Sequence, residues 1–137
     1  MLPRDDKEQV YMAKILIVED DQFMGRMYHK IFTHENHEVE IAVNGEEGLT
    51  KAKDWGPDIM LLDIMMPRMN GFQVLESMKK DPALMNIPII MLTNLAGDQD
   101  IEEAKSKGAA EYIVKSNYTP RQILDMVGKI LDGNVKQ

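Results

Sequence analysis

Short apolar segments and amphipathic segments alternate along the chain, and this alternation predicts its secondary structure. The apolar segments have the length of single β-strands and lie at 14–18, 38–43, 58–62, 87–92 and 111–114. Between them, apolar residues recur at the three- and four-residue spacing of one helix face. Strands and helices in strict alternation predict an α/β fold, with a parallel sheet covered by helices on both faces.

The residue pattern within each apolar segment predicts where its strand lies in the sheet. Segments 15–18, 59–62 and 89–92 are apolar at every position, as expected of strands buried on both faces. Segment 38–43 alternates between polar and apolar residues, as an edge strand with one solvated face does. Segments 15–18, 59–62 and 89–92 are therefore expected at the centre of the sheet.

Capping residues and apolar stripes predict the helices. Helix starts are predicted from Asn44 with Glu47, from Asp98 before a stop at Gly108, and from Thr119 with Pro120 and Gln122. The predicted inner faces carry Phe23, Met27 and Ile31 in the helix over 22–34, and Phe72, Leu75 and Met78 in the helix over 71–80.

Composition narrows the class of protein. The 137 residues suit one domain, predicted over 13–133, with an N-terminal extension or tag at 1–12 and a tail at 134–137. The first residues are polar and acidic, unlike a secretory signal, and no apolar run is long enough to cross a bilayer. With no cysteine in the sequence, we expect a cytoplasmic protein without membrane insertion. The net charge of −7 argues against direct nucleic-acid binding.

Polar side chains follow four of the predicted strands at the point where each strand ends. In chain order they are Glu19, Asp20 and Asp21, then Asp63, then Thr93 with Asn94, and finally Lys115. In an open parallel sheet the carboxyl ends of the strands form the edge at which ligands bind. We therefore expect the acids, a hydroxyl group and one lysine to gather at that edge.

This set of side chains suits phosphoryl transfer to a carboxylate. Carboxylates at close range repel one another unless a cation lies among them, and Mg²⁺ prefers such oxygen ligands. A lysine and a hydroxyl group can hold a second anion. A carboxylate itself can be the nucleophile and form an aspartyl phosphate.

Four segments together carry a family resemblance, namely "ILIVEDD" (15–21), "LLDIMMPRMNG" (61–71), "PIIMLTN" (88–94) and "AAEYIVK" (109–115). The sequence resembles the receiver domain of a two-component response regulator, from about residue 14 to residue 131. The resemblance implies a flavodoxin-like (βα)5 doubly wound parallel sheet with strand order 2-1-3-4-5.

The resemblance also implies a Mg²⁺-dependent phosphoacceptor. Asp63 is similar to the aspartate that takes a phosphoryl group from a phosphohistidine of a sensor kinase or a histidine phosphotransfer protein. Asp20 and Asp63 resemble direct Mg²⁺ ligands. Glu19 resembles a ligand through water, and Met65 a ligand through its backbone carbonyl. Lys115 resembles the lysine that pairs with the phosphoryl oxygens.

Two further residues resemble the parts of a switch. Thr93 resembles the hydroxyl that moves toward the phosphate, and Tyr112 the aromatic that turns inward after that movement. From the residues alone, Tyr112 can equally be a static, half-buried aromatic. The surface formed by residues 98–131 would then signal to a downstream protein, and it is also a possible homodimer surface.

The sequence departs from the family pattern in three places. Receivers usually have a cis proline after the lysine, where this chain has Ser116, so either the bond is trans with a rearranged loop or the cis form is retained at a cost of about 2.5–4 kcal/mol. Asn94 stands where the family prefers a very small residue. Met65 and Leu95 are apolar where the family tunes phosphoryl lifetime, and neither can orient a hydrolytic water. This predicts slow dephosphorylation.

Alternative functions are a phosphohydrolase, a cofactor-binding protein and a receiver-like interaction module that is not phosphorylated. A phosphohydrolase of the aspartate type would carry a second Asp as general acid where Met65 stands, and Met65 cannot transfer a proton. A glycine-rich phosphate-binding motif is absent. A signalling switch without metabolite turnover is therefore preferred. The unphosphorylated module stays open because of Ser116 and Asn94.

The sequence leaves smaller questions open as well. Met65, Met66 and Met69 crowd the loop after Asp63 and suit either a docking surface for a phosphodonor or packing beneath the loop. His37 is expected on the surface. Trp55 is expected to pack at the edge of the sheet.

Overall fold

The computed structural model describes residues 12–135 and places five parallel strands in one sheet, in the order β2-β1-β3-β4-β5. The strands are β1 (Lys14–Val18), β2 (Glu38–Ala42), β3 (Ile59–Leu62), β4 (Ile89–Thr93) and β5 (Glu111–Val114). The helices are α2 (Gln22–His34), α3 (Gly45–Trp55), α4 (Gly71–Lys80), α5 (Asp98–Ser106) and α6 (Pro120–Val135), with a short 3-10 helix η1 (Lys115–Asn117). The predicted flavodoxin-like fold and strand order are confirmed.

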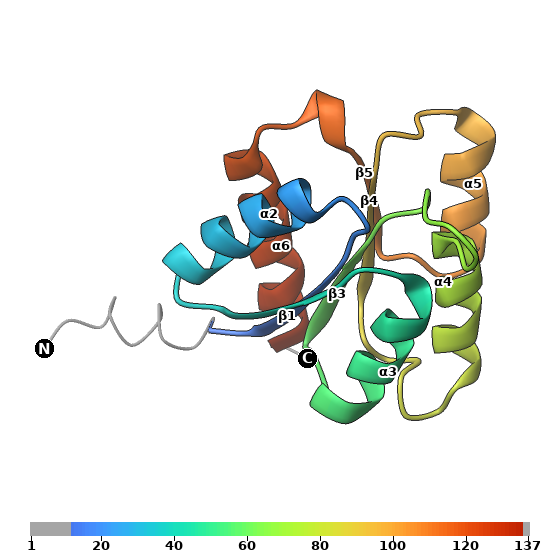
Figure 1. Cartoon of the computed structure of the whole chain (residues 1–137), viewed down its shortest axis with the longest axis horizontal. Helices are drawn as coiled ribbons and strands as arrows, with labels where there is room; N and C mark the ends of the chain where they lie inside the picture. The colour runs from blue at the N-terminus through green and yellow to red at the C-terminus, as the bar shows by residue number, and fades with distance from the viewer. Residues whose placement is uncertain (1–11, 136–137) are drawn as a thin grey trace, which may run out of the picture.

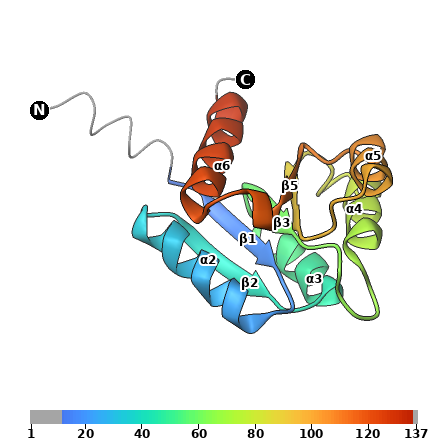
Figure 2. The same cartoon turned by 90° about the horizontal axis from the view of Figure 1, so that it is seen from above.

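The helices form two layers, one on each face of the sheet. Helices α2 and α6 cover one face, and α3, α4 and α5 cover the other (Figures 1 and 2). Alternate residues of each strand enter opposite cores, so Ile15 and Ile17 pack toward α2 and α6 while Leu16 and Val18 pack toward the other layer. The central strands β1, β3 and β4 are apolar on both faces because both faces are covered, as predicted.

The predicted inner face of α2 is wrong at Phe23, whereas Met27 and Ile31 are partly buried and pack against the core. Gly25, Tyr28 and Phe32 are buried, whereas Phe23 is 72% exposed. The two stripes lie one residue apart around the helix, and the bulky rings of Tyr28 and Phe32 take the central place against the sheet. Phe23 lies in the first helical turn, beside the carboxyl edge of the sheet.

Two other helix predictions need correction. Asp98 is the first residue of α5 and not its cap; the N-cap is Gly97, which offers no side-chain oxygen. In α4, Phe72 is only half-buried, and Val74 joins Leu75 and Met78 in the core.

The other predicted caps form. Thr119 and Gln122 exchange the two hydrogen bonds of a capping box at the start of α6. Asn44 caps α3, but the Glu47 carboxylate accepts from the N–H of Val43, one residue before the cap.

The amino edge of the sheet is joined by hydrogen bonds between side chains and backbone. The backbone N–H of Ala13 donates to His37 Nδ1 at 3.0 Å, so the expectation of a surface histidine is wrong and this ring is half-buried. The N–H of Lys14 donates to Asp58 Oδ2 at 2.8 Å. The Lys14 ammonium also lies 5.5 Å from the centroid of the Trp55 ring, which is half-buried against the core.

The structure describes only part of the terminal segments for which domain boundaries were predicted. Of the predicted extension at 1–12, residues 1–11 lie outside the described residues, and so do residues 136 and 137 of the tail. Helix α6 runs to Val135. Within residues 12–135, no helix is both long and apolar enough to span a membrane.

Candidate functional site

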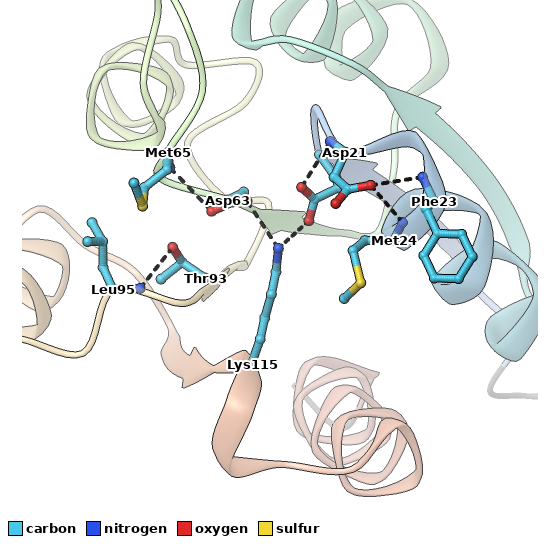
Figure 3. Close-up of polar contacts among 9 residues, drawn as sticks. Asp21, Phe23, Met24, Asp63, Met65, Thr93, Leu95 and Lys115 are labelled. Carbon is cyan, nitrogen blue, oxygen red and sulfur yellow. Dashed lines mark hydrogen bonds and ion pairs between the residues drawn. The ribbon is translucent and has the colours of Figure 1, made fainter.

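Charged side chains meet at the carboxyl edge of the sheet (Figure 3). Glu19 follows β1, Asp63 follows β3 and Lys115 follows β5, while Thr93 is the last residue of β4. The hydrogen-bond pattern of the sheet extends one residue past the ends of β1 and β3. The N–H of Glu19 donates to Ala42 O, and the N–H of Asp63 donates to Val18 O. These bonds fix both carboxylates beside each other.

Three carboxylates form a compact cluster. One oxygen each of Glu19, Asp20 and Asp63 lies within 4.8 Å of the other two. Glu19 and Asp63 are only 3% and 7% exposed, whereas Asp20 is exposed at the mouth of the site. Asp21 is turned away from the cluster, because its side chain caps α2 by accepting from the N–H groups of Phe23 and Met24. The chemistry of the three clustered residues, all hard oxygen donors, fits Mg²⁺.

Lys115 lies between the two buried acids. Its Nζ forms an ion pair with Glu19 Oε1 and another with Asp63 Oδ2 at 3.1 Å. No peptide bond within residues 12–135 is cis, so the trans alternative at Ser116 holds. Residues Lys115–Asn117 form η1 at this place, and Lys115 points to Asp63 (Figure 3).

Burial and charge shift the protonation equilibria of this pair. Burial raises the pKa of Glu19 to about 7, and the negative charge of Asp63 adds to this, while Lys115 opposes it. Burial alone would lower the pKa of Lys115. The hydrogen bond with Glu19 and the charge of Asp63 outweigh burial and raise it.

Thr93 and Tyr112 both contact Leu95, in the loop after β4. The Thr93 side chain is fully buried, and its hydroxyl accepts from the N–H of Leu95 at 3.4 Å. Tyr112 lies inward and donates its hydroxyl to the carbonyl of Leu95 at 2.8 Å. Burial raises the pKa of Tyr112 to about 12, so the phenol keeps the proton that it donates. Asn94 is exposed.

The methionines after Asp63 divide into two groups. Met66 is buried and Met69 is packed against the core, which favours packing beneath the loop. Met65 is 59% exposed, and its backbone N–H donates to Asp63 Oδ1 at 3.2 Å. The side chain of Met65 thus faces solvent beside Asp63.

Gly71 is a positioning residue whose role the sequence analysis missed. A Cβ atom at this position would lie 2.4 Å from the backbone oxygen of Asp63 and 2.7 Å from Ile64 Cα. The N–H of Gly71 donates to Ile64 O, and Asn70 and Gln73 form a capping box at the same place. The Asn-Gly pair at the start of an amphipathic helix is the signal that could have revealed it.

Comparison with known proteins identifies the family. The family described as "Response regulator receiver domain" matches residues 15–128. The chain belongs to this family.

Curated relatives and solved structures agree with this assignment. The chain is 38% identical over 103 residues to response regulator PleD of Caulobacter vibrioides, covering 75% of this chain and 23% of that protein. It is 35% identical over 119 residues to response regulator ArlR of Staphylococcus saprophyticus, covering 87% of this chain and 51% of that protein. The chain therefore spans about half, or less, of the curated relatives it matches.

Two solved structures of receivers are similar over nearly their whole length. A CheY-like receiver domain protein of Methanospirillum hungatei superposes with a TM-score of 0.84 at 33% identity, covering 91% of this chain and 98% of that one. Chemotaxis protein CheY4 of Vibrio cholerae gives a TM-score of 0.80 at 30% identity, covering 86% and 98%.

Proposed function

We propose that this receiver is a phosphorylation-controlled switch whose Asp63 accepts a phosphoryl group from a phosphohistidine. The meeting of Asp63 with Lys115 and with the acids Glu19 and Asp20 at one sheet edge carries this proposal. A carboxylate oxygen of Asp63 attacks phosphorus, the phosphorus–nitrogen bond of the donor breaks, and the leaving imidazole takes up a proton. The product is an acyl phosphate on Asp63.

Oxygen ligands for Mg²⁺ are assigned to four residues. Asp20 and Asp63 would bind it directly, Glu19 through water and Met65 through its backbone carbonyl. When bound, Mg²⁺ neutralises and orients the phosphoryl oxygens. The clustering of the three carboxylates supports this assignment.

Lys115 and Thr93 recognise the phosphoryl group once it is on Asp63. Lys115 Nζ already lies 3.1 Å from an Asp63 oxygen, so it can hold a phosphoryl oxygen with little movement. Thr93 ends the neighbouring strand, and its hydroxyl leaves the Leu95 N–H to donate to the phosphate. The inward Tyr112 holds the same loop through the Leu95 carbonyl. Phosphate contacts that favour this loop position shift the population toward it.

The phosphodonor is a sensor histidine kinase or a histidine phosphotransfer protein, and a downstream protein reads the 98–131 surface. That surface contains α5, β5 and most of α6, and Tyr112 connects it to the loop after β4. A homodimer through the same surface is part of the proposal. With a net charge of −7, this chain does not itself bind nucleic acid.

The test is intact mass after incubation with acetyl phosphate and Mg²⁺, for the parent and for Asp63→Asn. A Mg²⁺-dependent gain of one phosphoryl group in the parent alone supports the proposal. If neither protein gains mass, a phosphohistidine donor is tried next. Failure with both donors would leave the unphosphorylated interaction module as the function.

A further inference from the structure

Oxidisable side chains are unevenly exposed in the loop after Asp63. The sequence has 12 methionines and no cysteine, so thioethers are its only sulfur groups. Met65 is 59% exposed, whereas Met66 is 8% exposed and Met69 is packed against the core. A peroxide in solution therefore reaches the sulfur of Met65 far more readily than the sulfur of Met66.

The exposed thioether lies beside the carboxylate of Asp63. The backbone N–H of Met65 donates to Asp63 Oδ1 at 3.2 Å, which fixes the position of this residue. Figure 3 shows the side chains of Met65 and Leu95 on one side of Asp63, with Asp21 on the other. Neither Met65 nor Leu95 offers a strong hydrogen-bond acceptor to a water that approaches from their side.

We propose that Met65 is an oxidation site through which peroxide controls the lifetime of the phosphoryl group on Asp63. In the oxidation, a sulfur–oxygen bond forms at Met65 Sδ as the oxygen–oxygen bond of hydrogen peroxide breaks. The thioether loses two electrons and becomes a sulfoxide, and the second oxygen of the peroxide leaves as water. This inference rests on the proposed function, because it concerns release of the phosphoryl group from the same residue.

The sulfoxide supplies a polar group that the thioether lacks. Its oxygen accepts a hydrogen bond from water and can hold that water beside the phosphoryl group, whereas a thioether sulfur is a weak acceptor. When the water attacks phosphorus, a new phosphorus–oxygen bond forms as the bond to Asp63 breaks. The products are the free carboxylate and inorganic phosphate, and one proton passes to solvent. Oxidation of Met65 thus shortens the lifetime of the phosphoryl group, and reduction of the sulfoxide restores it.

The first part of the test locates the oxidation. The protein is treated with hydrogen peroxide, and peptide mass spectrometry follows the gain of one oxygen atom at each methionine. We expect Met65 to react about tenfold or more faster than Met66, which is buried. Met85, which is 45% exposed in the segment between α4 and β4, is the exposed comparison. Protection of Met65 to the same extent as Met66 would overturn the proposal.

The second part measures what the oxidation does. Treated and untreated samples are freed of peroxide and phosphorylated with acetyl phosphate and Mg²⁺, and the decay of the phosphorylated mass peak is followed. We expect decay in the parent to be about threefold or more faster after treatment, and methionine sulfoxide reductase to reverse this change. In Met65→Leu, which stays apolar but has no sulfur at this position, treatment should not change the decay rate. Met85→Leu is the matched control and should keep the full effect.

The outcomes separate this inference from the proposed function. Equal acceleration in the parent and in Met65→Leu, or oxidation of Met65 without faster decay, would overturn the inference while Asp63 phosphorylation stands. If the untreated parent gains no phosphoryl group from acetyl phosphate or from a phosphohistidine donor, the proposed function fails and the inference fails with it. The second failure is recognised without any peroxide.

Discussion

At the amino edge of the sheet, polar side chains bond to the backbone of a neighbouring strand, whereas at the carboxyl edge charged side chains bond to one another. His37 and Asp58 accept from backbone N–H groups at the first edge. At the second, Lys115 is paired with Glu19 and Asp63, which are nearly buried. Backbone pairing stabilises strand order locally. Buried charges cost desolvation energy, but they leave groups that can change partners.

The largest expected effect concerns the close backbone approach at the carboxyl edge. Gly71→Ala would place a methyl group 2.4 Å from Asp63 O, and we expect a loss of about 3 kcal/mol in the free energy of unfolding. Urea denaturation measures it. The control is Gly128→Ala in α6, where nothing lies within 4 Å of the new Cβ atom and a gain of about 1 kcal/mol is expected. Equal effects at both glycines would show that the backbone contact is unimportant.

The next effect concerns the lifetime of the phosphoryl group. Met65 is exposed beside Asp63 and Leu95 is half-buried in the loop after β4, and neither side chain can orient a water. We expect the double variant Met65→Asn with Leu95→Glu to hasten loss of the phosphoryl group about tenfold or more, because polar groups can then position that water. The decay of the phosphorylated mass peak reports the rate. Decay of the parent within seconds, or no change in the variant, contradicts slow dephosphorylation.

The smallest effect tests whether the two edges respond to pH in opposite directions. Burial lowers the pKa of His37 from its usual 6.5, so the neutral ring that accepts from Ala13 is favoured in the folded state. Stability from this group is present above pH 6.5 and is lost as the pH falls through the lowered pKa. Glu19 behaves oppositely. Its pKa, raised to about 7, gives stability at low pH that is lost as the pH rises through 7.

Urea denaturation at pH 5.5 and 7.5, with a chelator present, separates the two contributions. Relative to the parent, His37→Leu should lose about 1 kcal/mol at pH 7.5 and less at pH 5.5. His34→Leu, at the exposed end of α2, should follow the pH dependence of the parent. Glu19→Gln should remove the part of the loss of stability at high pH that comes from Glu19. If the free energy of unfolding changes with pH by the same amount in the parent and in all three variants, the prediction that the two edges respond to pH in opposite directions is wrong.

Periodicity predicted the strands, the layers and the edge at which the charged residues gather, because these follow from local patterns and from parallel topology. The inner face of α2 was only partly predictable from spacing, because Met27 and Ile31 pack against the core beside the buried Tyr28 and Phe32, whereas Phe23 is exposed. The role of His37 depends on Ala13, which is 24 residues distant in the chain. Such pairings depend on how strands align.

The position of Trp55 determines what its emission can report. It is the one tryptophan of the sequence, and it ends α3 beside Lys14, at the amino edge of the sheet. Asp63, the proposed phosphoacceptor, lies at the other end of β3. Fluorescence of this residue therefore monitors unfolding of the domain. Any spectral response to phosphorylation would measure a distortion transmitted along the full length of the sheet.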